Sequence, residues 1–101
     1  GEAVAIGMSV EATVAVARGL TTAGDARGLI RRIESYMLPT RVPADIAPEA
    51  IVAATLSDKK KSGGRVRWSL PAEIGTAAKQ DGQWGVAVDD AVALAALHER
   101  R

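Results

Sequence analysis

Residues 2–18 read EAVAIGMSVEATVAVAR and are apolar along almost their whole length. Several of them are β-branched, so part of the stretch could form a strand, but its length favours a helix because strands rarely exceed about ten residues. Gly19 followed by Leu20 is typical of a helix end, where glycine adopts a positive φ and the next residue packs back onto the last turn. A helix that is apolar on most faces needs cover on most faces. We expect part of that cover to be missing from this chain.

A second helix is predicted to follow directly. Thr22, with Asp25 three residues later, forms a capping box, and Pro39 ends the helix at or before Leu38. The predicted inner face has apolar residues at helical spacing, namely Ala26, Leu29, Ile30, Ile33 and Met37. The predicted outer face is charged, with Arg27, Arg31, Arg32 and Glu34.

A third helix is expected after a connector at residues 40–47, because Pro48 suits the first position of a helix. Its inner face would be Ile51, Val52, Thr55 and Leu56. The charged stretch 58–61, Asp-Lys-Lys-Lys, then runs into Gly63-Gly64, which indicates a helix end followed by a turn.

A small β element and a last helix complete the chain. Val66, Trp68 and Leu70 alternate with polar residues, as in a half-buried strand. The sequence Asp81-Gly82 predicts a two-residue hairpin turn between residues 76–80 and 83–88. Trp68 and Trp84 are interpreted as packing residues in these strands. Asp89 is the expected cap of the last helix. The predicted apolar face of that helix is Ala91, Leu94, Ala95 and Leu97.

Together these elements predict a mainly α fold, a helical domain of about four helices with a small antiparallel β element, in a single domain over residues 1–101. Hydrophobic residues make up 48% of the chain and charged residues 25%, which is typical of a globular domain. Aromatic residues make up only 3%, so the core must be built from Ala, Val, Leu and Ile.

The composition argues against several kinds of function. A net charge of +1 argues against a dedicated nucleic-acid binder, whose phosphate contacts need a basic surplus. The absence of cysteine excludes disulfides, thiolate metal sites and a cysteine nucleophile, and it is compatible with the cytoplasm. No apolar run reaches the roughly 18 residues of a membrane span. Glycine-rich phosphate loops, G-x-S-x-G and H-E-x-x-H motifs are absent.

Three features are candidates for chemistry, and each has a structural alternative. The lysines at 59–61 either offset the dipole of a helix C-terminus or bind an anion such as a phosphate. Glu2 has the ordinary role of a carboxylate in the first turn of a helix. His98 is interpreted as a solvated residue at a helix end, because a zinc site needs three or four protein ligands.

Several blocks of the sequence resemble 3-dehydroquinate synthases. Residues 1–8, GEAVAIGM, look like the start of a helix that a zinc-ligating histidine immediately precedes in that family. The further matches, in order along the chain, are Leu38-Pro39-Thr40, Asp58-Lys59-Lys60-Lys61, Gly64-Arg65-Val66-Arg67 and Glu73-Ile74-Gly75.

The resemblance implies a lyase of the shikimate pathway, and so of aromatic amino acid biosynthesis. The family converts 3-deoxy-D-arabino-heptulosonate 7-phosphate to 3-dehydroquinate and phosphate, using NAD and a divalent metal, zinc or cobalt. Its members have an N-terminal NAD-binding domain followed by a mainly helical domain, and this chain looks like the C-terminal part of the latter. In the family motif the first lysine after the aspartate contacts the substrate, which makes Lys59 the expected substrate-binding residue.

The resemblance also implies what this chain lacks. The family's metal ligands, a glutamate and two histidines, precede Gly1, as does the NAD-binding domain. We therefore expect no catalytic residue, NAD site or metal site in this chain alone, and no turnover by it. Since the chain starts with Gly1 rather than a methionine or a signal peptide, we expect it to have a predecessor or a processed or engineered end.

The expected partners are the sugar-phosphate substrate, the N-terminal domain of the same protein and a second copy in a homodimer, with no nucleic acid and no membrane. One departure from the family pattern is the length of residues 76–85, which predicts an extra hairpin arm. Two alternative functions stay open: a sister sugar-phosphate cyclase, and a non-catalytic helical interaction module that docks through the apolar first helix.

Overall fold

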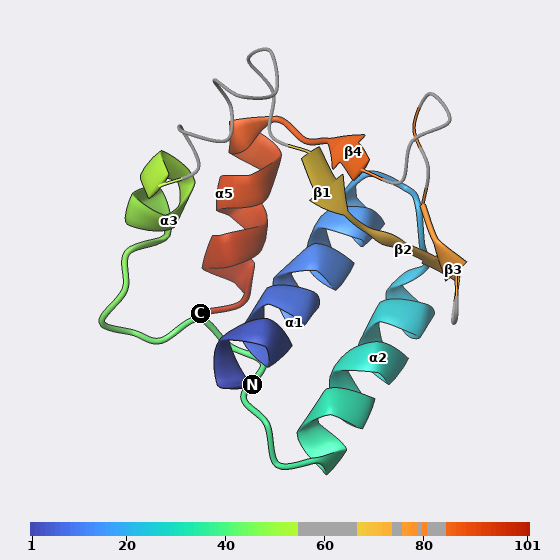
Figure 1. The fold of residues 1–101 in the computed structure, drawn as a ribbon, viewed down its shortest axis with the longest axis horizontal. Helices are drawn as coiled ribbons and strands as arrows, with labels where there is room; N and C mark the ends of the chain where they lie inside the picture. Colours follow the sequence, from blue (N-terminus) through green and yellow to red (C-terminus); the bar gives the residue numbers. More distant parts are fainter. Residues whose placement is uncertain (55–66, 74–75, 79, 81–84) are drawn as a thin grey trace.

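The structure of the chain, a computed structural model, describes residues 1–54, 67–73, 76–78, 80 and 85–101, and this part is mainly α. Helices α1 (Glu2–Ala17), α2 (Ala23–Ser35) and α5 (Asp90–Glu99) lie side by side with α1 in the middle (Figure 1). The short helix α3 (Pro48–Ala54) packs against α5. These helices, with a small antiparallel β element, confirm the predicted fold class.

Helix α1 ends as its sequence predicts. Gly19 has a φ of +70°, which glycine adopts without a steric penalty. Its N–H donates to the Val16 carbonyl at 3.0 Å, and the Leu20 N–H donates to the Ala15 carbonyl at 2.8 Å. Two carbonyls of the last turn are therefore satisfied by the chain that leaves it, which fixes the direction of that chain toward α2.

Helix α2 begins at the predicted cap. The hydroxyl of Thr22 accepts a hydrogen bond from the Asp25 N–H at 3.0 Å. Ala26 and Ile33 are buried on the predicted inner face, while the four charged residues of the outer face are exposed. The amphipathic pattern therefore placed this helix correctly against α1.

The predicted position of Met37 on the inner face of α2 is wrong. The helix ends at Ser35, and Met37 is 94% exposed with a φ of +61°. Its N–H donates to the Glu34 carbonyl at 2.9 Å, so Met37 closes the helix in the left-handed position that glycine usually takes. Helical spacing no longer applies beyond this point, which is why an apolar side chain faces outward.

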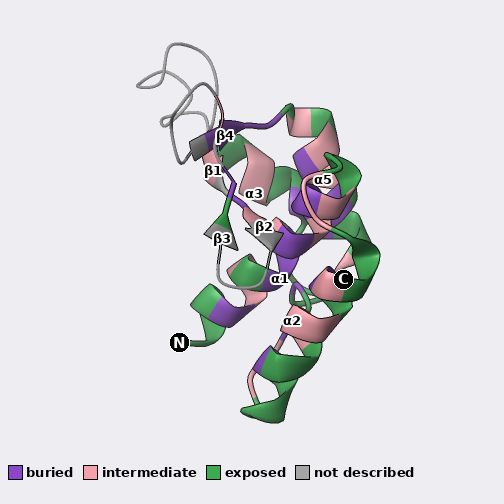
Figure 2. Cartoon of the chain, turned by 90° about the vertical axis from the view of Figure 1, so that its right-hand side faces the viewer, coloured by how far each residue is buried: buried purple, intermediate pink, exposed green. Residues whose placement is uncertain are grey.

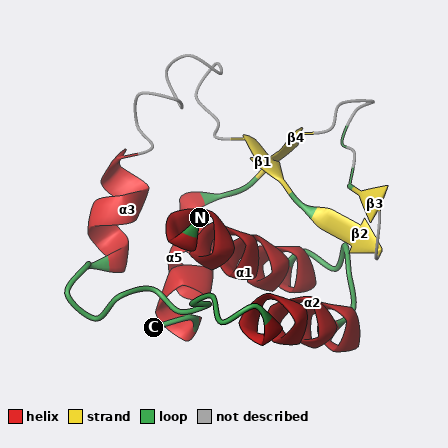
Figure 3. Cartoon of the chain, turned by 60° about the horizontal axis from the view of Figure 1, so that its bottom comes forward, coloured by secondary structure: helices red, strands yellow, loops and turns green. Residues whose placement is uncertain are grey.

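Two antiparallel strand pairs lie together on one side of the helices (Figure 3). Strand β1 (Arg67–Ser69) pairs with β4 (Gly85–Ala87), and β2 (Pro71–Glu73) pairs with β3 (Thr76–Ala77). The described ladders therefore do not pair β3 with β4, and the rest of the predicted hairpin between residues 76–80 and 83–88 falls largely on residues outside the described ranges. The pairing of β1 with β4 accompanies the burial of Leu70, Val86 and Val88 in one cluster, a tertiary contact that the pattern of a single strand does not reveal. Val66, Trp84 and the predicted Asp81-Gly82 turn lie outside the described residues.

The predicted apolar face of α5 is wrong in part. Asp89 does occupy the cap position, although its side chain makes no capping hydrogen bond. The buried residues are Ala93, Ala96 and Leu97, whereas Ala91 and Ala95 are exposed. Residues 90–99 are apolar almost all round the helix, so their spacing does not select a face. Ala91 and Ala95 instead line a hollow of about 390 Å³ between α1 and α5.

The core contains aliphatic side chains, as the lack of phenylalanine predicts. Figure 2 marks the buried residues along the helices and strands. The buried cluster of the core consists of Val10, Val14, Ala15, Val42, Leu70, Ala78, Val86, Val88, Ala93, Ala96 and Leu97. Trp68 is half-buried against this cluster, which confirms its interpretation as a packing residue. Ile51 and Val52 of α3 pack on it as predicted, while Thr55 and Leu56 lie outside the described residues.

A polar cluster of Ser9, Glu34, Thr40 and Arg100, here called the Thr40 cluster, ties the helices together. Ser9 and Thr40 are buried, and the Ser9 hydroxyl, which has one proton for two acceptors, lies 2.6 Å from the Thr40 carbonyl oxygen and 2.7 Å from the Ile6 carbonyl oxygen of its own helix. The Arg100 guanidinium donates to the Thr40 carbonyl at 3.0 and 3.2 Å and to the Thr40 hydroxyl at 3.0 Å. That hydroxyl donates to the Glu34 carboxylate at 2.6 Å. The cluster thus joins α1, α2, the connector and the end of α5.

Replacing Ser9 by alanine should lower the free energy of unfolding of the chain by about 1 kcal/mol, the usual net contribution of a buried hydrogen bond. The matched control is Ser35→Ala, because the Ser35 hydroxyl is exposed and donates only to the Arg32 carbonyl of its own helix. The control should change stability by less than about 0.5 kcal/mol. Urea unfolding followed by circular dichroism measures both, and equal effects would contradict a special role for Ser9.

Candidate functional site

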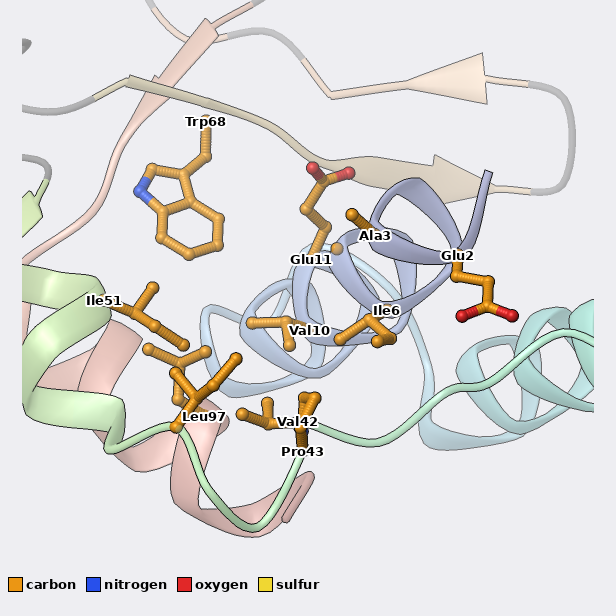
Figure 4. A pocket seen from close by; sticks show the side chains of 12 residues that line it. Glu2, Ala3, Ile6, Val10, Glu11, Val42, Pro43, Ile51, Trp68 and Leu97 are labelled. Atoms are coloured by element: carbon orange, nitrogen blue, oxygen red, sulfur yellow. The ribbon is translucent and has the colours of Figure 1, made fainter.

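A groove with a volume of about 630 Å³ opens along the N-terminal half of α1. Helix α1 contributes one wall, and the connector, α3, β1 and α5 contribute the others (Figure 4). The lining residues are Glu2, Ala3, Ile6, Gly7, Val10, Glu11, Val42, Pro43, Ile46, Ile51, Trp68 and Leu97. The Thr40 cluster holds the connector against α1 and the end of α5, and so positions the connector side of the groove.

The groove is apolar apart from two carboxylates. Ile6 and Val10 lie along its middle, with Trp68 on one side and Val42 on the other (Figure 4). Glu2 lies in the first turn of α1, exposed to solvent, at the edge of the groove. The first-turn position gives Glu2 the favourable contact with the helix dipole that the sequence predicts.

Glu11 is the carboxylate with an altered environment. It is half-buried, and burial raises the pKa of its carboxyl above the ordinary value of 4.5. Within the described ranges its side chain makes no ion pair and no hydrogen bond. Sequence reasoning did not single out this residue, although a lone carboxylate inside an apolar helix is a signal that could have identified it.

Lys59, the predicted substrate-binding residue, lies outside the described residues, and so does the whole Asp58-Lys59-Lys60-Lys61 block. The last described residue before the block is Ala54, which ends α3. Ile51 of the same helix lines the groove.

His98 lies at the end of α5, as predicted, and is exposed. Its Nε2 atom is 2.9 Å from the Glu49 carboxylate of α3, and this contact lowers the pKa of Glu49. The pair links the two helices at the surface, where an ion pair contributes little to stability.

The part of the chain that the structure describes contains no group of three or more His, Cys, Asp or Glu side chains that could hold a metal ion. A zinc or cobalt ion therefore does not fit a site built from the described side chains alone. In the same part of the chain, no helix has the length and apolar character needed to cross a membrane.

The sequence model of the family described as 3-dehydroquinate synthase C-terminal matches residues 1–61, more than half of the chain. The chain belongs to this family. The match includes α1, α2 and α3 and extends through the Asp58-Lys59-Lys60-Lys61 block. It therefore confirms the resemblance seen in the sequence.

Curated relatives of the chain are named 3-dehydroquinate synthase. The chain is 43% identical over 75 residues to the 3-dehydroquinate synthase of Acaryochloris marina, an alignment covering 74% of this chain and 20% of that protein. It is 41% identical over 81 residues to the enzyme of Nostoc punctiforme, covering 80% and 22%. It is 40% identical over 77 residues to that of Xanthomonas campestris, covering 76% and 21%. The chain thus spans about a fifth of the length of these relatives.

Replacing Glu11 by glutamine should change how the stability of the chain depends on pH. The folded-state pKa of Glu11 is raised, so the stability linked to its protonated form is present below pH 4.5 and is lost as the pH rises through the folded pKa. Glutamine cannot ionise, so Glu11→Gln should be the more stable chain at neutral pH, and its advantage should disappear toward pH 4. Thermal unfolding at a series of pH values measures the difference.

The control for this prediction is Glu49→Gln. The pKa of Glu49 is lowered, so the stability that its ionised carboxylate contributes is lost as the pH falls. The effect of Glu49→Gln on stability should therefore have the opposite pH dependence to that of Glu11→Gln. A Glu11→Gln chain that is less stable than the unmodified chain at neutral pH would contradict the burial of an unpaired carboxylate.

Proposed function

We propose that this chain is the C-terminal part of a 3-dehydroquinate synthase, which converts 3-deoxy-D-arabino-heptulosonate 7-phosphate to 3-dehydroquinate and phosphate. The observation that carries the proposal is the family match over residues 1–61, which includes Asp58-Lys59-Lys60-Lys61. The names of the curated relatives support it. In this proposal the chain is a single domain of a cytoplasmic homodimeric enzyme.

In the full-length protein, Lys59 binds the substrate near its phosphate. An ammonium group on a flexible stem acts as a point charge for phosphate, and a preorganised cation stabilises the charge that develops as phosphate leaves. At about 4 Å and an effective dielectric constant near 20, this attraction is about 4 kcal/mol. Such an energy is enough to make one lysine decisive for the use of the substrate.

The remaining chemistry belongs to the part of the enzyme that precedes Gly1. NAD, bound by the N-terminal domain, would supply the transient oxidation and the later reduction. A zinc or cobalt ion would be held by a glutamate and two histidines, with the last histidine immediately before Gly1. For these reasons the 101-residue chain by itself should show no turnover.

The two alternatives have weaker support. A sister sugar-phosphate cyclase would share the fold, but the relatives from Acaryochloris, Nostoc and Xanthomonas are all named 3-dehydroquinate synthase. An interaction module would use the exposed apolar residues of α1, such as Val4 at 65% exposure. It does not explain why the family match extends through the lysine block.

Replacing Lys59 by alanine in the full-length enzyme should lower kcat/KM for the heptulosonate phosphate by at least about 100-fold, the usual effect of removing one charge-stabilising group. Lys61→Ala is the matched control, because it removes the same charge from the same block and should leave kcat/KM within about threefold. Phosphate release and 3-dehydroquinate formation are measured together. An unchanged kcat/KM for Lys59→Ala would contradict the proposed role of Lys59.

A further inference from the structure

Helix α1 is covered unequally along its length. In its second half Ala12, Val14 and Ala15 are fully buried. In its first half Val4 is 65% exposed and Met8 is 39% exposed, although the sequence there is just as apolar. The groove lies beside this first half and is itself lined by apolar side chains. Val4 and Met8 are not among its lining residues, so the concave apolar surface of the groove by itself marks a place where another segment packs.

We propose that the groove holds an amphipathic helix from the part of the same polypeptide that precedes Gly1, with its apolar face on Ile6, Val10 and Trp68 and a lysine or arginine beside Glu11. The inference rests on the proposed function, because it takes this chain as one part of a longer synthase. It goes beyond that function by naming which surface the rest of the protein covers and the chemistry of the covering segment.

The position of the chain's first residues favours this occupant. Glu2 and Ala3, at the start of α1, both line the groove, so a segment that leads into α1 enters directly at the groove. In proteins of the length of the curated relatives, about four fifths of the polypeptide lies outside the stretch that aligns with this chain. A helix is the expected form because the groove runs along α1, whose residues Ala3, Ile6, Gly7 and Val10 line it at positions i, i+3, i+4 and i+7.

The charge of the groove specifies the occupant further. Glu2 and Glu11 are its acidic lining residues, and among the described residues that line it there is no arginine, lysine or histidine. Glu11 is half-buried and has no ion-pair partner in the described ranges. A buried carboxylate is normally paired or hydrogen-bonded. A basic side chain on the incoming helix would form an ion pair with Glu11. An apolar helix without a cation would leave this carboxylate unpaired.

The direct test is photocrosslinking in the full-length protein. The photoreactive residue p-benzoylphenylalanine is introduced in place of Ile46, which lines the groove and is 40% exposed. The matched control carries it in place of Met37, which is 94% exposed and does not line the groove. After irradiation, mass spectrometry should find position 46 joined to a peptide preceding Gly1 in the same chain, with a yield independent of protein concentration. Position 37 should not be joined to that peptide.

Two outcomes would overturn the inference: a crosslink from position 46 to a second copy, seen as a product of doubled mass, or no crosslink to the preceding part of the chain. The charge is tested separately by Glu11→Gln in the full-length protein, which should lower its melting temperature because the basic partner loses its carboxylate. A higher melting temperature would overturn the charge pairing. The unsubstituted full-length protein is assayed for 3-dehydroquinate, and its inactivity would contradict the proposed function whatever the crosslinks show.

Discussion

The carbonyl oxygen of Thr40 is the point at which distant parts of the chain are joined. It accepts hydrogen bonds from Ser9 of α1 and from Arg100 at the end of α5, while the Thr40 hydroxyl contacts Glu34 of α2. A buried carbonyl without these donors would carry a large desolvation penalty, so burial of the connector depends on α1 and the end of α5, which supply them. The neighbouring Val42 N–H donates to the Arg100 carbonyl at 2.8 Å and continues this attachment. The groove depends on it, because Val42 and Pro43 form one of its sides.

Helix α1, to which the connector is attached through Ser9, has two halves with different surroundings. Beyond Val10 the helix is enclosed by α2, α5 and the strands, and its aliphatic side chains form the core. Before Val10, Ala5 and Ser9 are buried but Val4 and Met8 are exposed, and this half contributes to a groove with a half-buried carboxylate. A domain that is complete in itself has little reason to leave such a surface open. The match of this chain to about a fifth of its relatives gives a consistent explanation, since most of each relative lies outside the aligned stretch.

Local signals in the sequence predicted the ends of the helices well. The Thr22 cap, the positive φ of Gly19 and the start of α3 at Pro48 each follow from the chemistry of one or two residues. Features that depend on tertiary packing were not predictable in this way. The buried face of α5 and the pairing of β1 with β4 are set by which apolar residues meet across the core. The Thr40 cluster was missed because its members are distant from one another in sequence. The half-buried state of Glu11 was missed because it depends on which residues fold around it. For function, the blocks shared with the family carried more information than the described geometry, and Lys59 lies outside the described residues.

The central proposal is that this chain works as one part of a longer synthase. The measurement that tests it most directly is the intact mass of the protein that contains the chain, with sequencing of the residues before Gly1. The account predicts a polypeptide about as long as the curated relatives, with a histidine immediately before Gly1 and a nucleotide-binding domain further upstream. A natural protein that begins at Gly1, or an upstream sequence without that histidine and that domain, would contradict it.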